Sequence, residues 1–93
     1  MNIKIAIVDD NSFLISAIKE KLSFFDDLTI KHTSLNGSDL LTKLEDNHII
    51  DVVLMDIEMP ILNGIETTQI VKQKYPQIKI IMLTAFDNDE NIF

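Results

Sequence analysis

The chain has 93 residues, enough for one small domain, and 46% of them are hydrophobic, so a core can form. Its net charge of −7 repels phosphate backbones, which argues against direct nucleic-acid binding by this segment. It has no cysteine, which excludes disulfides and thiolate metal sites and is typical of a reducing cytoplasm. No apolar run approaches the roughly eighteen residues needed to cross a bilayer, and the first residues lack the layout of a secretory signal. We therefore expect a soluble, cytoplasmic domain with no membrane contact.

The first half of the chain alternates strand-like runs with stretches of helical spacing. Residues 3–8 and 28–32 are short β-rich runs. Between them, apolar side chains that recur every four residues predict one face of an amphipathic helix: Phe13, Leu14, Ala17, Ile18 and Leu22. A second helix is predicted around Leu40, Leu41 and Leu44, after the turn and cap residues 36–38.

The second half repeats this alternation. Residues 51–55 and 78–83 are strand-like, and a helix between them is expected to begin near Gly64. That helix should end near Tyr75, because Pro76 disfavours helical backbone at the residue before it. Residues 87–90 carry acids suited to the first turn of a further helix.

The apolar runs indicate how the strands are arranged. The runs at 3–8, 51–55 and 78–83 are apolar on both faces, which is typical of a parallel sheet covered by helices on both sides. A strand–helix alternation of this kind predicts an α/β fold with an open, doubly wound sheet.

Acidic residues follow the predicted strands. In a parallel α/β sheet all carboxyl ends lie on one edge, where ligands bind at the point of reversed winding. Asp9 and Asp10 follow the first strand, Asp56 the third and Thr84 the fourth. We therefore expect three carboxylates and a hydroxyl to meet at this edge.

Each of these residues also has a structural explanation. Asp9 and Asp10 could cap the following helix and complement its dipole. Asp56 could be an ordinary loop acid, and Thr84 could close a strand. These explanations weaken when taken together, because chance seldom places all three acids on one catalytic edge.

Converging carboxylates repel one another, which raises their pKa values or requires a cation. Their hard oxygen ligands suit Mg²⁺. Beside such a cation, a carboxylate can attack phosphorus and form an acyl phosphate. A hydroxyl or an ammonium group could hold a remaining phosphoryl oxygen.

The run Asp-Ile-Glu-Met-Pro-Ile-Leu-Asn-Gly at residues 56–64 resembles the signature of the response regulator receiver (CheY-like) domains. Val-Asp-Asp at residues 8–10 and Leu-Thr-Ala at 83–85 resemble the other two sequence blocks of that family. Further residues, at 74–76 and 83–87, look most like receivers of the NarL/LuxR-type regulators, which carry a helix-turn-helix output domain. The resemblance implies a flavodoxin-like sheet and a role in two-component signal transduction.

The resemblance also implies roles for individual residues. Asp56 would accept the phosphoryl group from a sensor histidine kinase. Asp10 would bind Mg²⁺ directly, Asp9 through a coordinated water, and Glu58 through its backbone carbonyl. Thr84 would be the switch hydroxyl that bonds the phosphoryl group. The domain would thus be a phosphoacceptor, not an enzyme, and would reach DNA only through a C-terminal output domain.

The family pattern continues beyond residue 93 with a fifth strand that ends in a Lys-Pro pair and a fifth helix. We therefore expect residues 1–93 to be a receiver domain truncated within its fourth helix. Without a fifth strand, the fourth would be an apolar edge able to pair with a second chain as a homodimer.

Two other functions are compatible with parts of the pattern. A Mg²⁺-dependent phosphohydrolase with an aspartyl nucleophile would need a second acid two residues after the nucleophile, at the end of its first strand. Here the candidate nucleophile follows the third strand, and Asp9 and Asp10 are adjacent. A degenerate receiver that only binds proteins would lack site residues, whereas the acids and Thr84 are all present.

Overall fold

The structure is a computed structural model that describes residues 2–59 and 61–83. The elements follow in the order β1 (Ile3–Val8), α1 (Ser12–Leu22), β2 (Leu28–Ser34), α2 (Gly37–Asp46), β3 (Val52–Asp56), α3 (Gly64–Lys74) and β4 (Lys79–Leu83). Each strand and helix that the sequence predicts within these residues is present, although β2 continues past residue 32 and β3 includes Asp56. The further helix expected from residue 87 lies outside the described residues.

The strands form one sheet in the order β2-β1-β3-β4, and every neighbouring pair is parallel. The predicted doubly wound α/β fold is therefore confirmed, with the strand order of a flavodoxin-like sheet. From β1 the chain winds outward to β2, then returns across β1 to β3. The winding direction thus reverses between β1 and β3, where such folds place their ligands.

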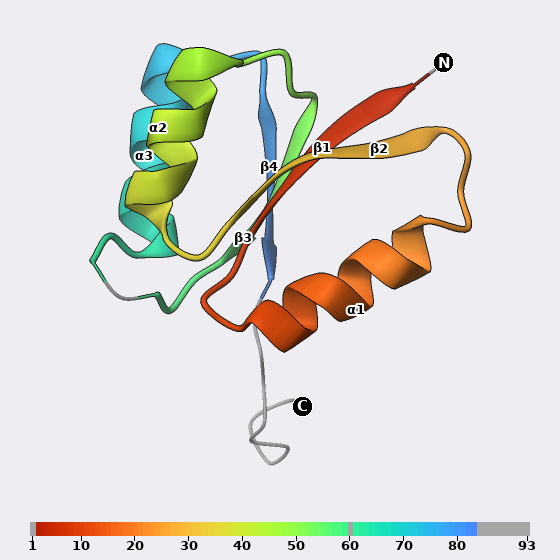
Figure 1. Ribbon diagram of the computed structural model, residues 1–93. Coiled ribbons are helices and arrows are strands. Elements are labelled where there is room, and N and C mark those ends of the chain that lie inside the picture. The colour runs from red at the N-terminus through yellow and green to blue at the C-terminus, as the bar shows by residue number, and fades with distance from the viewer. Residues whose placement is uncertain (1, 60, 84–93) are drawn as a thin grey trace, which may run out of the picture.

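Helices cover both faces of the sheet (Figure 1): α2 and α3 lie side by side on one face, and α1 lies on the other. Between the sheet and the α2–α3 pair is the larger apolar cluster, which includes Leu40 and Leu44 of α2, Val71 of α3 and Val53 and Met55 of β3. The cluster beneath α1 is smaller and is built around Ile5, Ile7 and Ile15.

Helix α1 packs only part of the predicted row of side chains against the sheet. Ile15, Ile18 and Leu22 pack against the sheet, whereas Phe13, Leu14 and Ala17 are exposed. Rows at Phe13/Ala17 and at Ile15/Ile18/Leu22 have equally good helical spacing, and they differ by about half a turn of the helix. Only contact with the sheet selects between them, so the prediction was wrong for Phe13, Leu14 and Ala17 and is confirmed for Ile18 and Leu22.

Within the part of the chain that the structure describes, an asparagine side chain caps the start of each helix. Asn11 accepts hydrogen bonds from the backbone of Phe13 and Leu14, Asn36 from Asp39, and Asn63 from Glu66. Such N-caps satisfy backbone N–H groups that have no partner within the helix. Within the described residues, no helix is long and apolar enough to cross a membrane.

Candidate functional site

Three carboxylates meet at the carboxyl edge of the sheet, on the two strands where the winding reverses. Asp9 and Asp10 directly follow β1, and Asp56 is the last residue of β3. One carboxylate oxygen from each lies within 4.8 Å of the other two. The structure thus brings together the three acids that the sequence predicted at one edge.

Asp9 is held firmly in place and is only 3% exposed. Its backbone N–H donates to the carbonyl of Ser34 at 3.0 Å, which ties the end of β1 to the end of β2. Its carboxylate accepts a hydrogen bond from the backbone N–H of Asn11 at 2.9 Å. Asp10, the next residue, is exposed, so the pair presents one buried and one accessible carboxylate.

Asp56 is half-buried, and α3 is packed closely against its peptide group. The backbone N–H of Gly64 donates to the carbonyl of Ile57 at 2.8 Å. A Cβ at position 64 would lie 2.1 Å from the carbonyl oxygen of Asp56, so only glycine fits there. Asn63 and Glu66 form a capping box that secures this first turn of α3. Gly64 therefore sets the position of the Asp56 backbone.

Burial and mutual repulsion make these carboxylates harder to ionise. Burial raises the pKa of Asp9 above its ordinary value, the Asn11 N–H opposes this, and the charge of Asp10 raises it again. Burial likewise raises the pKa of Asp56, and repulsion from Asp9 and Asp10 adds to it. The backbone N–H groups of Ile57 and Glu58 lower the Asp56 pKa in part. The site is thus an electronegative centre that a cation would relieve.

The donor set fits Mg²⁺. This small, hard cation is held in proteins by one or two carboxylates, with water and phosphate oxygens filling the remaining positions. Asp10 and Asp56 are accessible enough to bind it, and the buried Asp9 lies within the same group. The observed cluster therefore supplies the ligand chemistry that the sequence predicted.

The other predicted site residues are placed only in part. Glu58 follows the strand end with its side chain exposed, and the carboxylate cluster does not include it. Thr84 lies outside the described residues, so its role stays a prediction. One feature near the site was not predicted: Ile61, in the loop between β3 and α3, has a φ of 73°. A positive φ can be expected from a sequence only where Gly or Asn occurs. An isoleucine gives no such signal.

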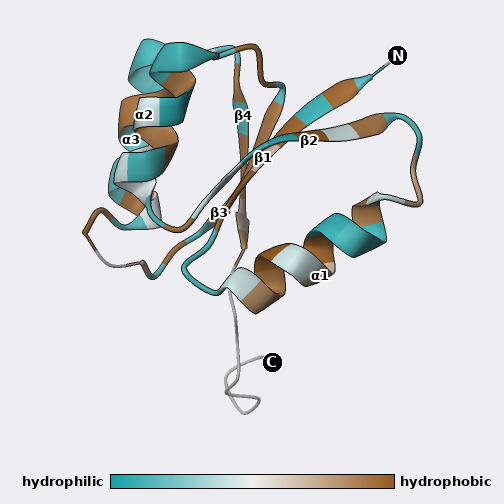
Figure 2. Ribbon diagram, in the orientation of Figure 1, coloured by the Kyte–Doolittle hydropathy of each residue, from teal (hydrophilic) through white to brown (hydrophobic). Residues whose placement is uncertain are grey.

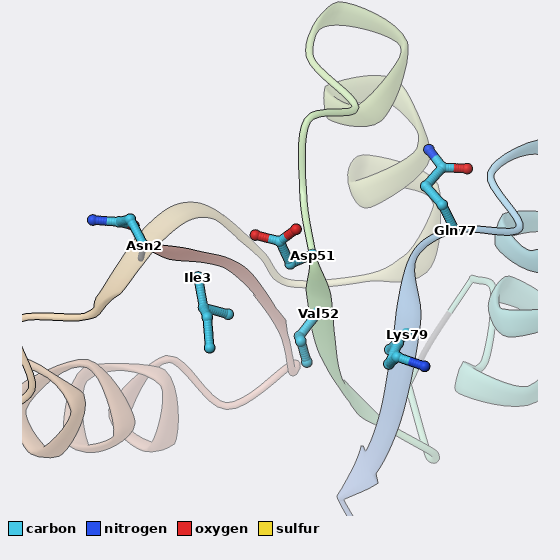
Figure 3. A pocket seen from close by; sticks show the side chains of 6 residues that line it. All are labelled: Asn2, Ile3, Asp51, Val52, Gln77 and Lys79. Atoms are coloured by element: carbon cyan, nitrogen blue, oxygen red, sulfur yellow. The ribbon is translucent and has the colours of Figure 1, made fainter.

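The structure also has an open hollow of about 380 Å³, but it lies at the opposite edge of the sheet (Figure 3). It is lined by Asn2, Ile3, Asp51, Val52, Gln77 and Lys79. Asp51 has a structural function there, because its carboxylate accepts from the backbone N–H of Lys4 at 2.8 Å. None of the three clustered acids lines this hollow, so it is separate from the site.

Comparison with known proteins agrees with this geometry. The response regulator receiver domain model matches residues 5–93. The response regulator protein VraR of Staphylococcus epidermidis is 34% identical over 93 residues, which cover 100% of this chain and 44% of VraR. The transcriptional regulatory protein LnrK of Bacillus subtilis is 36% identical over 84 residues, or 90% of this chain and 38% of LnrK. The chain thus spans about two fifths of the length of the curated relatives it matches.

Among solved structures, the response regulator domain of Thermotoga maritima CheB superimposes with a TM-score of 0.84 at 28% sequence identity. The superposition covers 96% of this chain and 65% of that one. The chain belongs to the response regulator receiver domains of two-component systems.

Proposed function

We propose that Asp56 accepts a phosphoryl group from a phosphohistidine of a sensor histidine kinase. The observation that carries this proposal is the cluster of Asp9, Asp10 and Asp56 at the winding reversal of the sheet. Receiver domains are in general phosphoacceptors rather than enzymes, and Asp56 is the only one of the three acids that ends β3. Its carboxylate lies within 4.8 Å of those of Asp9 and Asp10.

The transfer is a single displacement at phosphorus. A carboxylate oxygen of Asp56 forms a bond to phosphorus while the bond from phosphorus to the imidazole nitrogen of the donor breaks. The nitrogen keeps the electron pair and takes up a proton. The product is an aspartyl phosphate whose added charge lies beside Asp9 and Asp10.

In the proposed site Asp10 and Asp56 would hold Mg²⁺ directly, Asp9 would act through a water, and Glu58 would offer its backbone carbonyl. When bound, the ion supplies positive charge that offsets the charge of the transferring group and of the carboxylates. Thr84 supplies the hydroxyl that bonds the phosphoryl group after transfer. This assignment rests on its place directly after β4, whose last residue pairs with Asp56.

For the whole protein we propose a cytoplasmic regulator in which phosphorylation of the receiver controls a DNA-binding output domain. The names of VraR and LnrK as a response regulator and a transcriptional regulatory protein support this. The acidic receiver itself would not bind DNA, since its net charge is −7.

The test is phosphorylation by a small donor. The full-length protein is incubated with phosphoramidate and Mg²⁺, and its intact mass is measured beside that of the Asp56→Asn variant. We expect one phosphoryl group on the unmodified protein and none on the variant. Equal labelling of the two proteins would refute the assignment of Asp56.

A further inference from the structure

The start of α2 lies against the start of α3 with no room for an added side-chain atom. A Cβ at Gly37 would lie 1.8 Å from Oγ1 of Thr67 and 2.9 Å from the carbonyl oxygen of Leu62. Position 37 needs glycine for this reason alone, since no glycine in the described part of the chain has a positive φ. The contact therefore sets how closely the two helices approach each other where both begin, at the carboxyl edge of the sheet (Figure 1).

Thr67 is the member of this contact on α3, and its side chain is fully buried. Its hydroxyl donates to the backbone carbonyl of Asn63 at 2.7 Å, and its backbone N–H donates to the same oxygen at 2.9 Å. The hydroxyl cannot turn away from Gly37 without losing its partner, which is costly for a buried polar group. Thr67 thus connects the contact with α2 to Asn63, the N-cap of α3.

Gly64, the first residue of α3, holds both peptide groups that follow the side chain of Asp56. A Cβ at Gly64 would lie 2.1 Å from the carbonyl oxygen of Asp56, and the Gly64 N–H donates to the carbonyl of Ile57 at 2.8 Å. Because a peptide group is planar, these two carbonyls fix the directions of the N–H groups of Ile57 and Glu58. Burial raises the pKa of Asp56, and these N–H groups oppose the rise because they face its carboxylate. The position of α3 therefore controls the donors beside that carboxylate.

Packing against the sheet holds α2 mainly beyond its first residue. Its buried apolar residues, Leu40 and Leu44, lie about one and two turns after Gly37. Figure 2 shows the hydrophobic residues of α2 in the middle of the helix. Contact with Thr67 is thus a separate constraint on where α2 begins, and through α3 it reaches the acidic site.

We propose that Gly37 and Thr67 are positioning residues for phosphoryl transfer, because their contact sets the place of α3 and thereby the peptide groups around Asp56. This inference rests on the proposed function of Asp56. Neither residue belongs to the carboxylate cluster, so both act through α3. Reaction rates depend steeply on where the attacking atom lies, and a shift of about 1 Å can cost up to about a hundredfold.

The experiment changes this contact and leaves every proposed ligand and the nucleophile in place. Gly37→Ala adds the Cβ that meets the Thr67 hydroxyl, and Gly37→Ala/Thr67→Ala also removes that hydroxyl. Thr67→Ala removes the hydroxyl without creating a clash, whereas Thr67→Ser keeps it. Val71→Ala is the matched control, because Val71 is fully buried in the apolar cluster one turn farther along α3.

Two properties are measured on the full-length protein, at a temperature at which circular dichroism shows every compared variant to be folded. The first is the dissociation constant of Mg²⁺, from calorimetric titration in the absence of a phosphoryl donor. The second is the initial rate of phosphorylation by phosphoramidate, from intact mass. A loss of packing alone would lower the melting temperature and leave both properties unchanged.

We expect Gly37→Ala to weaken Mg²⁺ binding and to slow phosphorylation by about tenfold each, and the double variant to recover at least about threefold of each loss. Thr67→Ala alone should weaken both by about threefold, and it decides the question if Gly37→Ala does not fold. Thr67→Ser should stay within about twofold of the unmodified protein. Val71→Ala should melt at a lower temperature but bind Mg²⁺ and accept the phosphoryl group normally.

Unchanged Mg²⁺ binding and phosphorylation in Gly37→Ala or, if that variant does not fold, in Thr67→Ala would overturn the positioning role. A double variant no better than Gly37→Ala, or an equal loss in Val71→Ala, would overturn it as well. If the unmodified protein accepted no phosphoryl group from phosphoramidate, or Asp56→Asn accepted as much, the proposed function itself would fail and this inference with it.

Discussion

The crowding of three carboxylates should destabilise the metal-free fold, and replacing Asp56 by asparagine tests this directly. Two unit charges 4.8 Å apart repel by ~0.9 kcal/mol in water and by ~3.5 kcal/mol at the effective dielectric constant of a protein surface. Asp56 is half-buried and faces both Asp9 and Asp10, so its repulsion lies between these limits. Asparagine has the same shape without the charge, but it forms weaker hydrogen bonds with the backbone N–H groups of Ile57 and Glu58. We therefore expect Asp56→Asn to raise the free energy of unfolding by roughly 1–2 kcal/mol at pH 7.

The assay is thermal unfolding in EDTA and in Mg²⁺. In a domain of this size about 1 kcal/mol corresponds to a shift of roughly 4–8 °C, which is easily measured. Mg²⁺ at a hundred times its dissociation constant should stabilise the unmodified protein by about 2.7 kcal/mol, and the variant by clearly less. Asp26→Asn is the matched control, because Asp26 is an exposed acid in the connection between α1 and β2, at the opposite edge of the sheet. A variant that is no more stable than the unmodified protein in EDTA, or that gains as much from Mg²⁺, would refute the reasoning.

The pH dependence of stability can be checked on the same samples, two further properties on new variants, and a fourth on a polypeptide of residues 1–93. Because the pKa values of Asp9 and Asp56 are raised, their repulsion is absent below the unfolded pKa of about 4 and complete above the raised values. The free energy of unfolding of the metal-free protein, measured relative to that of Asp56→Asn, should therefore fall as the pH rises through this window. A difference between the two proteins that stays constant with pH would contradict this. Asp10→Ala should abolish the Mg²⁺-dependent rise in melting temperature, and an unchanged rise would exclude Asp10 as a ligand. Gly64→Ala should lower the free energy of unfolding in denaturant by about 1–3 kcal/mol, because the new methyl group meets the Asp56 carbonyl. An unchanged unfolding midpoint would show that α3 can shift freely. A polypeptide of residues 1–93 should form dimers or larger species, which light scattering would detect. The reason is that β4 pairs only with β3 among the described residues and Ile81 is half exposed. A well-folded monomer at high micromolar concentration would contradict this.

The sheet and the acidic cluster could be predicted from the sequence because both depend on patterns that can be recognised without knowing the tertiary contacts. Runs that are apolar on both faces indicate a parallel sheet, and parallel strands place their carboxyl ends on one edge. Asp9, Asp10 and Asp56 follow from these two rules alone, and the structure brings them together.

Other features depend on contacts that the sequence does not specify. The buried row of α1 is chosen by how the helix lies on β1 and β2, so Ile15 was missed and Phe13 was wrongly expected inside. The left-handed backbone of Ile61 could not be predicted either, because the residue type argues against it. The role of Gly64 in positioning Asp56 could not be predicted either. It depends on how close a Cβ at position 64 would come to the carbonyl oxygen of Asp56.

The central claim is that Asp56, and not one of its acidic neighbours, carries the phosphoryl group. Sodium borohydride reduces an aspartyl phosphate to homoserine, which marks the phosphorylated residue permanently. The full-length protein would be phosphorylated by phosphoramidate in Mg²⁺, reduced, digested and analysed by tandem mass spectrometry. Our account predicts homoserine at position 56 and intact aspartate at positions 9 and 10. Homoserine at position 9 or 10, or at none of the three, would contradict it.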